Sequence, residues 1–547
     1  MSLLSLLVAR RFRLPRRVSG RVIVERDVKI PMRDGVVLLA DRWYPRGAER
    51  APLVLMRSPY GRGGLFGLMG RLFAERGFQV LLQSCRGTGG SGGAFDPMRQ
   101  EQADGVDTVS WISTQPWLAG RLYTYGASYL GYTQWALAKE AGKRIGAMAL
   151  QVTLSNFRNE TLAFGGFTLE GSLQWTTMMR ALNGRDPLWA LLKRRRRPKS
   201  FMAKIHAHLP LNELDRLSTG ETVQWWQEWV GHGEPDDPWW AKIDHSRDVG
   251  DIEAPAVMVG GWRDIFLPSQ INDFTAMQAQ RRDVWLTIGP WDHVSTDGMA
   301  ESLRQALVLF AADAAGRRPF EDRDRVRLYV TGAAEWRDFP SWPPPGSRQV
   351  PFYLQPSAQL STAPPDAMAE PTRYVYDPRD PTPSLHGPKV MGDAKTPDMS
   401  LLEARADTVS FTTSPLAANL DVIGPARVEL CFRSDRAHTD FYICLCDVRA
   451  SGTPLHVLDG YLRVRPAESQ PDADGVRRIS IECWPTAHRF LRGHRLRLIV
   501  ASGAHPRYAR NPGSGEPLGS ATRMLPARQE IFHDAPRPSA LWLSVCS

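Results

Sequence analysis

The sequence predicts a mainly parallel α/β domain that is interrupted by a helical insertion and followed by an all-β domain. Short apolar runs alternate with segments of helical periodicity up to about residue 155 and again from about residue 245, which is typical of a parallel sheet covered by helices. After about residue 325 short alternating runs are separated by Pro, Gly and Asp, as in β-sandwiches. The chain has 547 residues, too many for one core, so several domains are expected.

The first α/β segment opens with two strands that turn at Asp34-Gly35, a dipeptide typical of β-hairpins. Buried strands are then predicted at "APLVLMRS", "FQVLLQS", "RLYTYG" and "RIGAMALQVT". Apolar residues at helical spacing predict helices between them, in "LFGLMGRLFAERG", "EQADGVDTVSWISTQPW" and "SYLGYTQWALAKEAG". The alternation returns at "APAVMVGGW", "PSQINDFTAMQAQ" and "DVWLTIGPWDH", which indicates that one sheet continues after the insertion.

The insertion has a different composition, with helical periodicity and many tryptophans, and we interpret it as a helical cap. Most of these tryptophans are expected in the core of the cap and some around a substrate pocket. The dense basic run "KRRRRPK" at 193–199 is expected to be a solvated loop, with contact to an anionic partner or membrane as the alternative. The expected boundaries are an N-terminal extension at 1–19, the α/β domain at 20–155 and 245–324, the cap at 156–244, and the all-β domain at 325–547.

Composition and charge narrow the class of protein. The net charge of +10 comes from arginines spread along the chain. We therefore expect it to affect solubility and the rate of encounter with other molecules, rather than to mark a defined nucleic-acid site. No apolar run approaches the roughly 18 residues of a membrane-spanning helix. The Leu-rich start is expected to pack on the body or to fray, with an amphipathic membrane anchor as the alternative. The six cysteines lack metal-site spacing and are expected to be buried thiols, which predicts a cytoplasmic protein without a metal.

"YTYGASYLGY" at 123–132 places Ser128 on a tight turn between a predicted strand and a predicted helix. The nucleophile of an α/β-hydrolase sits on such a turn, usually in the pattern G-x-S-x-G. Here Leu130 stands where the second glycine is usual, and Gly131 follows one residue later. We expect Gly131 to make the close contact between helix and strand.

A serine hydroxyl needs a base within reach and an acid that orients this base. In α/β-hydrolases the partners follow the serine in the order acid, then histidine. Asp264 in "GGWRDIF" and His293 in "GPWDH" follow two predicted strands in this order. Asp292 competes for the role of the acid, but adjacent residues rarely form the required side-chain hydrogen bond, so Asp264 is preferred.

The charge that develops on an acyl oxygen needs hydrogen-bond donors. The backbone N–H of Tyr129, directly after the serine, fits this role. The residues alone leave Tyr60 in "RSPYGR" open between a phenolic donor and a packed loop aromatic. The glycine-rich "CRGTGGSGG" at 85–93 lacks the ending of a phosphate-binding loop and is expected to be a tight loop, so no cofactor is predicted.

Taken together, the motifs resemble the CocE/NonD family of serine hydrolases, the cocaine esterase and X-Pro dipeptidyl-peptidase group. The resemblance covers nearly the whole chain and rests on "MRDGVVLLADRWYP", "SPYGR", "YGASYLGYTQW", "GGWRDIF", "GPWDH" and "FLRGHRLRLIVASGAHPRYARNPG". It implies an α/β-hydrolase domain with an inserted helical cap, followed by an all-β jelly-roll domain. At the matching positions it implies Ser128 as nucleophile, Asp264 as acid, His293 as base and Tyr60 as an oxyanion donor.

The predicted function is hydrolysis of a small-molecule carboxylic ester, or an amide, through an acyl-enzyme. One alternative is an X-Pro dipeptidyl-peptidase or α-amino-acid ester hydrolase that pairs a substrate ammonium with a buried carboxylate, with Glu160, Glu170 and Asp186 as candidates. Another is a non-catalytic binding module, which the complete set of Ser128, Asp264 and His293 disfavours. No nucleic-acid partner is predicted, and a homodimer is compatible with the sequence.

Overall fold

The computed structural model describes residues 3–118, 120–184, 199–388, 390 and 398–546. The predictions for Asp186, Trp189 and the basic run except Lys199 concern residues outside these ranges. The chain divides into one unit of Met1–Phe157, Ala181–Ala190 and Trp239–Arg327, and a second of Arg158–Arg180, Leu191–Pro238 and Leu328–Ser547. Within the described residues, no helix is both long enough and apolar enough to span a bilayer.

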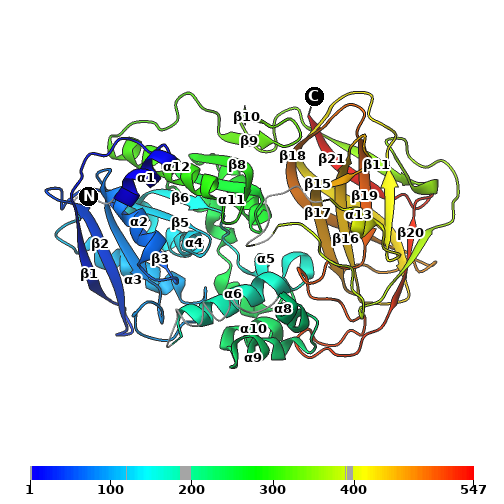
Figure 1. Cartoon of the computed structure of the whole chain (residues 1–547), viewed down its shortest axis with the longest axis horizontal. Coiled ribbons are helices and arrows are strands. Elements are labelled where there is room, and N and C mark those ends of the chain that lie inside the picture. The colour runs from blue at the N-terminus through cyan, green and yellow to red at the C-terminus, as the bar shows by residue number, and fades with distance from the viewer. Residues whose placement is uncertain (1–2, 119, 185–198, 389, 391–397, 547) are drawn as a thin grey trace. The chain divides into compact units, whose positions relative to one another are not determined.

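The first unit is built on a mostly parallel sheet covered by helices (Figure 1). Its strands are β1 (Val22–Pro31), β2 (Val37–Pro45), β3 (Leu53–Ser58), β4 (Gln79–Ser84), β5 (Leu122–Ala127), β6 (Ile145–Gln151), β7 (Ala256–Arg263) and β8 (Val284–Asp292). Its main helices are α1 (Leu3–Arg11), α2 (Gly64–Ala74), α3 (Glu101–Ser113), α4 (Tyr129–Ala141), α11 (Leu267–Ala279) and α12 (Thr296–Ala314). The sheet order is β1-β2-β4-β3-β5-β6-β7-β8-β9-β10, with β3 to β8 parallel to one another.

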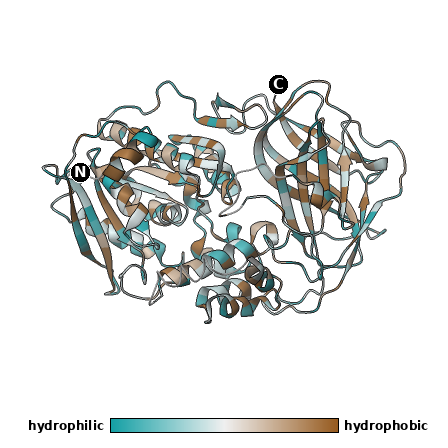
Figure 2. Cartoon of the chain, viewed as in Figure 1, coloured by the Kyte–Doolittle hydropathy of each residue, from teal (hydrophilic) through white to brown (hydrophobic). Residues whose placement is uncertain are grey.

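The strands lie where the apolar runs predict them. The turn between β1 and β2 contains Gly35 at φ +83°, a conformation that glycine adopts without steric cost. Alternate strand residues such as Tyr123 and Tyr125 join one hydrophobic cluster with α2 and α12. Thr124 between them faces the other way and hydrogen-bonds Gln134 of α4 at 2.7 Å, so helices cover both faces of the sheet. Figure 2 shows brown, hydrophobic stretches on several strands of this sheet, beside paler ones.

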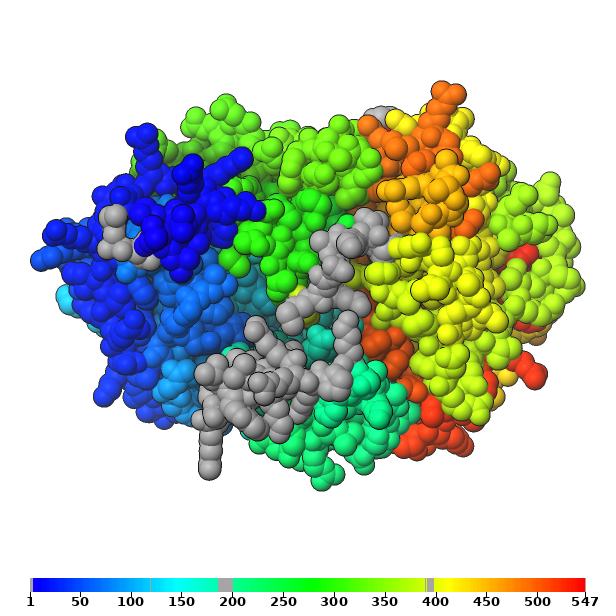
Figure 3. Space-filling view, viewed as in Figure 1, coloured from blue at the N-terminus to red at the C-terminus, as the bar shows by residue number. Residues whose placement is uncertain are grey.

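The N-terminal extension is folded and packs on the first unit. This agrees with the prediction that it packs on the body of the protein. Phe12 is 5% exposed and joins the cluster of α2 and α12. The Ser5 hydroxyl donates to Glu75 at 2.7 Å, and the Phe12 carbonyl accepts from Arg304 of α12 at 2.7 Å. Figure 3 shows the beginning of the chain, in dark blue, as part of the molecular surface.

The insertion is helical, as predicted. Its described helices are α5 (Arg158–Thr161), α6 (Leu169–Leu182), α8 (Lys199–His206), α9 (Leu214–Thr219) and α10 (Gln224–Gly231). Trp225, Trp226 and Trp229 of α10 are at most 5% exposed, so they form core rather than surface. Trp226 also donates to the Leu211 carbonyl at 2.9 Å, which satisfies its buried indole N–H.

The second unit contains the predicted all-β domain. After β9 (Val326–Val330) and β10 (Glu335–Phe339), its elements are β11 (Arg348–Gln355), β12 (Gln359–Ser361), β13 (Thr372–Tyr376), α13 (Ser400–Glu403), β14 (Thr408–Thr412), β15 (Leu420–Ser434), β16 (Thr439–Val448), β17 (Pro454–Val464), β18 (Arg477–Phe490), β19 (Arg495–Ala501), β20 (Ala527–Phe532) and β21 (Ala540–Cys546). Strand β21 pairs with both β11 and β15, so the sheet closes on itself like a barrel.

Asp273 of α11 gives the first unit a pH-dependent stability. Its carboxylate accepts from the Ser155 hydroxyl at 2.5 Å and the Ser155 N–H at 3.0 Å, and burial raises its pKa to about 7. Between about pH 4 and pH 7 the folded state therefore holds a proton that the unfolded state releases. As the pH rises through this range, the free energy of unfolding falls by up to about 1.4 kcal/mol per pH unit. We expect Asp273→Asn to lose this dependence in urea unfolding at pH 5 and pH 8. Exposed Asp322→Asn is the control, and parallel profiles for wild type and Asp273→Asn would contradict the assignment.

Candidate active site

Ser128 lies on a strained turn between β5 and α4. Its φ and ψ are +57° and −125°, a left-handed backbone conformation that residues other than glycine rarely adopt. The turn is held by hydrogen bonds on both sides of the residue. The Ser128 N–H donates to the Gln151 carbonyl at 3.0 Å, and the Ser128 carbonyl accepts from the Thr153 hydroxyl at 2.8 Å. The backbone therefore fixes the direction in which the hydroxyl projects.

Gly131 is the second glycine of the turn at Ser128, which we call the elbow. It makes the close contact between helix and strand that the sequence predicts. A Cβ on Gly131 would lie 2.4 Å from the Thr153 side chain, so only glycine fits there. Leu130 is also packed tightly, because it is 2% exposed and a Cβ on Gly126 would lie 2.4 Å from the Leu130 Cβ. The elbow thus uses both glycines: Gly126 makes room for Leu130, and Gly131 lets α4 approach the end of β6.

The structure brings Ser128, His293 and Asp264 into one hydrogen-bonded line. His293 Nε2 lies 2.9 Å from Ser128 Oγ, and His293 Nδ1 lies 2.6 Å from Asp264 Oδ2. Asp264 is fully buried, and the side chain of His293 is 8% exposed. With Asp264 ionised, Nδ1 carries the proton of the neutral ring, and Nε2 is left to accept the serine proton.

The geometry distinguishes Asp264 from its competitor. Asp264 Oδ1 accepts from the Phe266 N–H at 2.9 Å, which holds the carboxylate in place while Oδ2 faces the histidine. Asp292 instead accepts from the Val294 N–H at 3.2 Å in a local turn. The acid in contact with His293 is therefore the one at the end of β7.

Tyr60 and Tyr129 lie beside each other near the elbow. Their rings meet edge to face with centroids 6.4 Å apart, and Tyr60 also stacks on Phe66 at 6.0 Å. Tyr60 follows β3, where its N–H donates to the Ser58 hydroxyl at 3.1 Å. Tyr129 is the first residue of α4, and the first N–H groups of a helix point out from its N-terminus.

A buried network beneath Tyr129 was not predicted from the sequence. The Tyr129 hydroxyl donates to Glu101 at 2.8 Å and accepts from the Met98 N–H at 2.9 Å. Glu101 also pairs with the fully buried Arg57 at 2.8 Å. Burial, together with the Glu101 charge, raises the pKa of Tyr129 well above its ordinary value, so its hydroxyl stays protonated. The residue that follows Ser128 is therefore anchored through its side chain.

Phe266 is a second contact that the sequence did not single out. Its ring meets the His293 ring edge to face with centroids 5.1 Å apart, and it is 6% exposed. The residues that follow Asp264 in the chain, Ile265 to Leu267, are all apolar. On this side the histidine ring therefore packs against a hydrophobic side chain.

Two of the candidates for an ammonium site lie near each other, because a Cβ on Gly171, the neighbour of Glu170, would lie 3.8 Å from the Glu160 carboxylate. Glu160 lies in α5 and Glu170 in the first turn of α6, both in the second unit, while Asp186 is outside the described residues. Among the described residues, no group of three or more His, Cys, Asp or Glu side chains has the arrangement of a metal site.

Comparison with known proteins shows which family the chain belongs to. Residues 34–295 match the family model of the X-Pro dipeptidyl-peptidase (S15 family), and residues 319–541 match that of the X-Pro dipeptidyl-peptidase C-terminal non-catalytic domain. A cocaine esterase from Rhodococcus sp. (strain MB1 Bresler) is 28% identical over 96% of this chain and 99% of its own length. The chain belongs to this family of serine hydrolases.

Solved structures of the family show the same fold from end to end. An α-amino acid ester hydrolase is 23% identical, with a TM-score of 0.81 over 97% of this chain and 98% of its own. A CocE/NonD family hydrolase from Staphylococcus aureus is 16% identical, with a TM-score of 0.72 over 96% of this chain and 94% of its own. The α/β domain and the all-β domain predicted from the sequence are therefore both confirmed as features of the family fold.

Proposed function

We propose that the protein hydrolyses carboxylic esters of small molecules, with Ser128 as the nucleophile, His293 as the general base and Asp264 as the orienting acid. The observation that carries the proposal is the unbroken line of hydrogen bonds from Asp264 through His293 to Ser128, at 2.6 and 2.9 Å. These distances lie within the reach that proton transfer requires. The full-length likeness to an esterase supports an ester as substrate.

The reaction follows from the positions of these groups. As Ser128 Oγ attacks the acyl carbon, His293 Nε2 takes its proton, and the buried Asp264 carboxylate stabilises the imidazolium that forms. The Tyr129 N–H and the Tyr60 hydroxyl donate to the oxygen that becomes negatively charged. His293 then gives its proton to the departing alcohol. In the second half of the reaction His293 takes a proton from water, the water oxygen attacks the acyl carbon, and the proton returns to Ser128 Oγ as the acid leaves.

The proposed oxyanion role of Tyr60 predicts the effect of removing one oxygen atom. Tyr60→Phe keeps the ring packing on Phe66 and Tyr129 but lacks the donor, so kcat should fall about 10²- to 10³-fold. Steady-state hydrolysis of p-nitrophenyl acetate measures the change. Tyr44→Phe is the matched control, because the Tyr44 hydroxyl binds Glu25 instead. A Tyr60→Phe variant with wild-type kcat would remove Tyr60 from the oxyanion site.

A second candidate function is favoured by the S15 family match and by the α-amino acid ester hydrolase fold. Such an enzyme would recognise a free α-amino group through a carboxylate, whereas Phe266, the residue of the Asp264 loop that contacts the His293 ring, is apolar. We therefore place neutral esters first. Residues Glu160 and Glu170 are the described candidates for the ammonium partner.

Rates with three matched substrates test the proposal against this alternative. These are the p-nitrophenyl ester of an N-acylated amino acid, the same ester with a free α-amino group, and an X-Pro p-nitroanilide. We expect the two esters to show a burst of p-nitrophenol and the N-acylated one to have the higher kcat/KM. A strong preference for the free amine, or cleavage of the X-Pro anilide alone, would establish the second candidate.

A further inference from the structure

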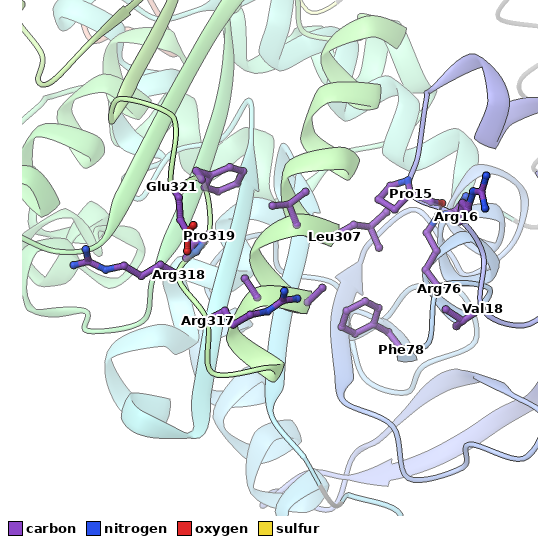
Figure 4. A pocket seen from close by; sticks show the side chains of 14 residues that line it. Pro15, Arg16, Val18, Arg76, Phe78, Leu307, Arg317, Arg318, Pro319 and Glu321 are labelled. Carbon is purple, nitrogen blue, oxygen red and sulfur yellow. Dashed lines mark hydrogen bonds between the residues drawn. The ribbon is translucent and has the colours of Figure 1, made fainter.

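A pocket of about 540 Å³ in the first unit is built from none of the residues assigned to ester hydrolysis (Figure 4). Its volume lies within the range of about 300–1,000 Å³ that is typical of small-molecule sites. It is lined by Pro15, Arg16, Val18, Arg76, Phe78, Leu307, Val308, Ala311, Ala312 and the segment 317–321. Leu307 lies about 16 Å along α12 from the helix start that follows His293. The pocket is thus separate from Ser128, His293 and Asp264.

The floor of the pocket is apolar. Phe78 and Leu307 are 5% and 3% exposed, and Ala312 is buried beside them on α12. Val308 and Val18 on the wall are 39% and 73% exposed. Such a surface favours an apolar group, because covering it removes hydrocarbon from water.

The charged residues of the pocket are four arginines against a single glutamate, Glu321. Figure 4 shows Arg16 and Arg76 on one side of Leu307 and Phe78, and Arg317 on the other. Of these, Arg76 is half-buried, and its guanidinium donates to the neutral Pro15 and Leu72 carbonyls, at 3.0 and 2.9 Å. Burial lowers its pKa, and the charge of the neighbouring Glu75 offsets only part of this effect.

The lack of carboxylate partners separates these arginines from the buried arginines of the same unit. Arg57 pairs with Glu101 and Arg86 with Asp104. Within the described part of the chain, no carboxylate lies within ion-pair distance of the four arginines of the pocket. An anion bound between them would gain charge-assisted hydrogen bonds that the protein itself does not supply.

From this combination we infer that the pocket binds an amphipathic anion, a negatively charged head held by the arginines with an apolar chain on Phe78 and Leu307. A medium-chain fatty carboxylate is the simplest molecule of this kind. The ligand is a free molecule in solution. The arginines recognise its negatively charged head through both charge and hydrogen bonds. This site is additional to ester hydrolysis and does not depend on the roles proposed for Ser128 and its partners.

Calorimetric titration of the full chain with decanoate and with 1-decanol tests the inference. We expect one decanoate per chain, bound at least about tenfold more tightly than the alcohol, since hydrogen bonds to charged groups are the stronger ones. Arg317→Gln combined with Arg318→Gln should weaken decanoate binding about tenfold. These two side chains are exposed, so the change does not disturb the core. Arg50→Gln, an exposed arginine outside the pocket, is the control with unchanged affinity.

Ala311→Trp tests the apolar part separately. Ala311 is exposed on the pocket-facing part of α12, so a large side chain there fills the pocket without overpacking the core and should abolish binding of both molecules. Equal affinity for decanoate and 1-decanol, or decanoate binding that survives both variants, would overturn the inference. Binding to phosphatidylglycerol vesicles without binding of decanoate would also overturn it, in favour of a membrane-facing surface.

Discussion

Ser128→Ala is expected to lower ester turnover by about 10⁴- to 10⁶-fold, because the variant retains the base and the oxyanion donors but has no nucleophile. Covalent labelling by a fluorophosphonate should disappear in the same variant. Alanine at φ +57° is strained to the same degree as serine, so the elbow should keep its conformation. Initial rates with p-nitrophenyl acetate and gel-based labelling measure the two effects.

The control for this change is Ser110→Ala, which removes a hydroxyl from an exposed position on α3. It should label and turn over substrate like the wild type. The thermal unfolding midpoint of each variant shows whether the fold is retained. Labelling that persists in folded Ser128→Ala would mean that another residue is the nucleophile.

Asp264→Asn should lower kcat by about 10⁴-fold, a larger effect than the loss of one hydrogen bond would give. Asp264 Oδ1 accepts from the Phe266 N–H, so the amide of the variant keeps its oxygen there and turns its NH₂ group toward His293. An NH₂ group at that position donates to Nδ1 and places the ring proton on Nε2. The histidine then cannot accept the proton of Ser128, although every heavy atom remains near its original position.

Asp292→Asn is the matched control, because it makes the same chemical change one residue from His293. Asp292 accepts from the Val294 N–H in its own turn, whereas His293 Nδ1 contacts Asp264, so kcat should change less than about threefold. The ratio of kcat values for the two variants measures which acid orients the base. A larger loss in Asp292→Asn than in Asp264→Asn would reverse the assignment.

The sequence was sufficient to place the proposed catalytic side chains because local chemistry and chain order constrain them together. A serine at a strand-to-helix turn, then an acid and a histidine after later strands, must meet if the strands are parallel neighbours, since their carboxyl ends lie at one edge of the sheet. The order β5-β6-β7-β8 satisfies this condition. Gly131 could be predicted for a similar reason, because a close approach of helix and strand leaves no room for a Cβ.

The supporting contacts could not be predicted in this way. Arg57 stands within an apolar strand and Glu101 opens a helix more than forty positions later, so no spacing links them to Tyr129. Their meeting depends on how α3 and α4 pack, which sequence periodicity does not specify. Phe266 is likewise an ordinary apolar residue in the sequence, and only the fold shows its ring against His293.

The pairing of β21 with both β11 and β15 has a consequence for biosynthesis. Translation reaches Ala540–Cys546 after every other strand of that sheet, so the ring of strands stays open until this segment is available. Until then β11 and β15 each expose an unpaired edge, and such edges are templates for association between chains. Nascent or truncated chains that lack β21 should therefore depend on chaperones and aggregate readily, even though the α/β domain that carries Ser128 is complete hundreds of residues earlier.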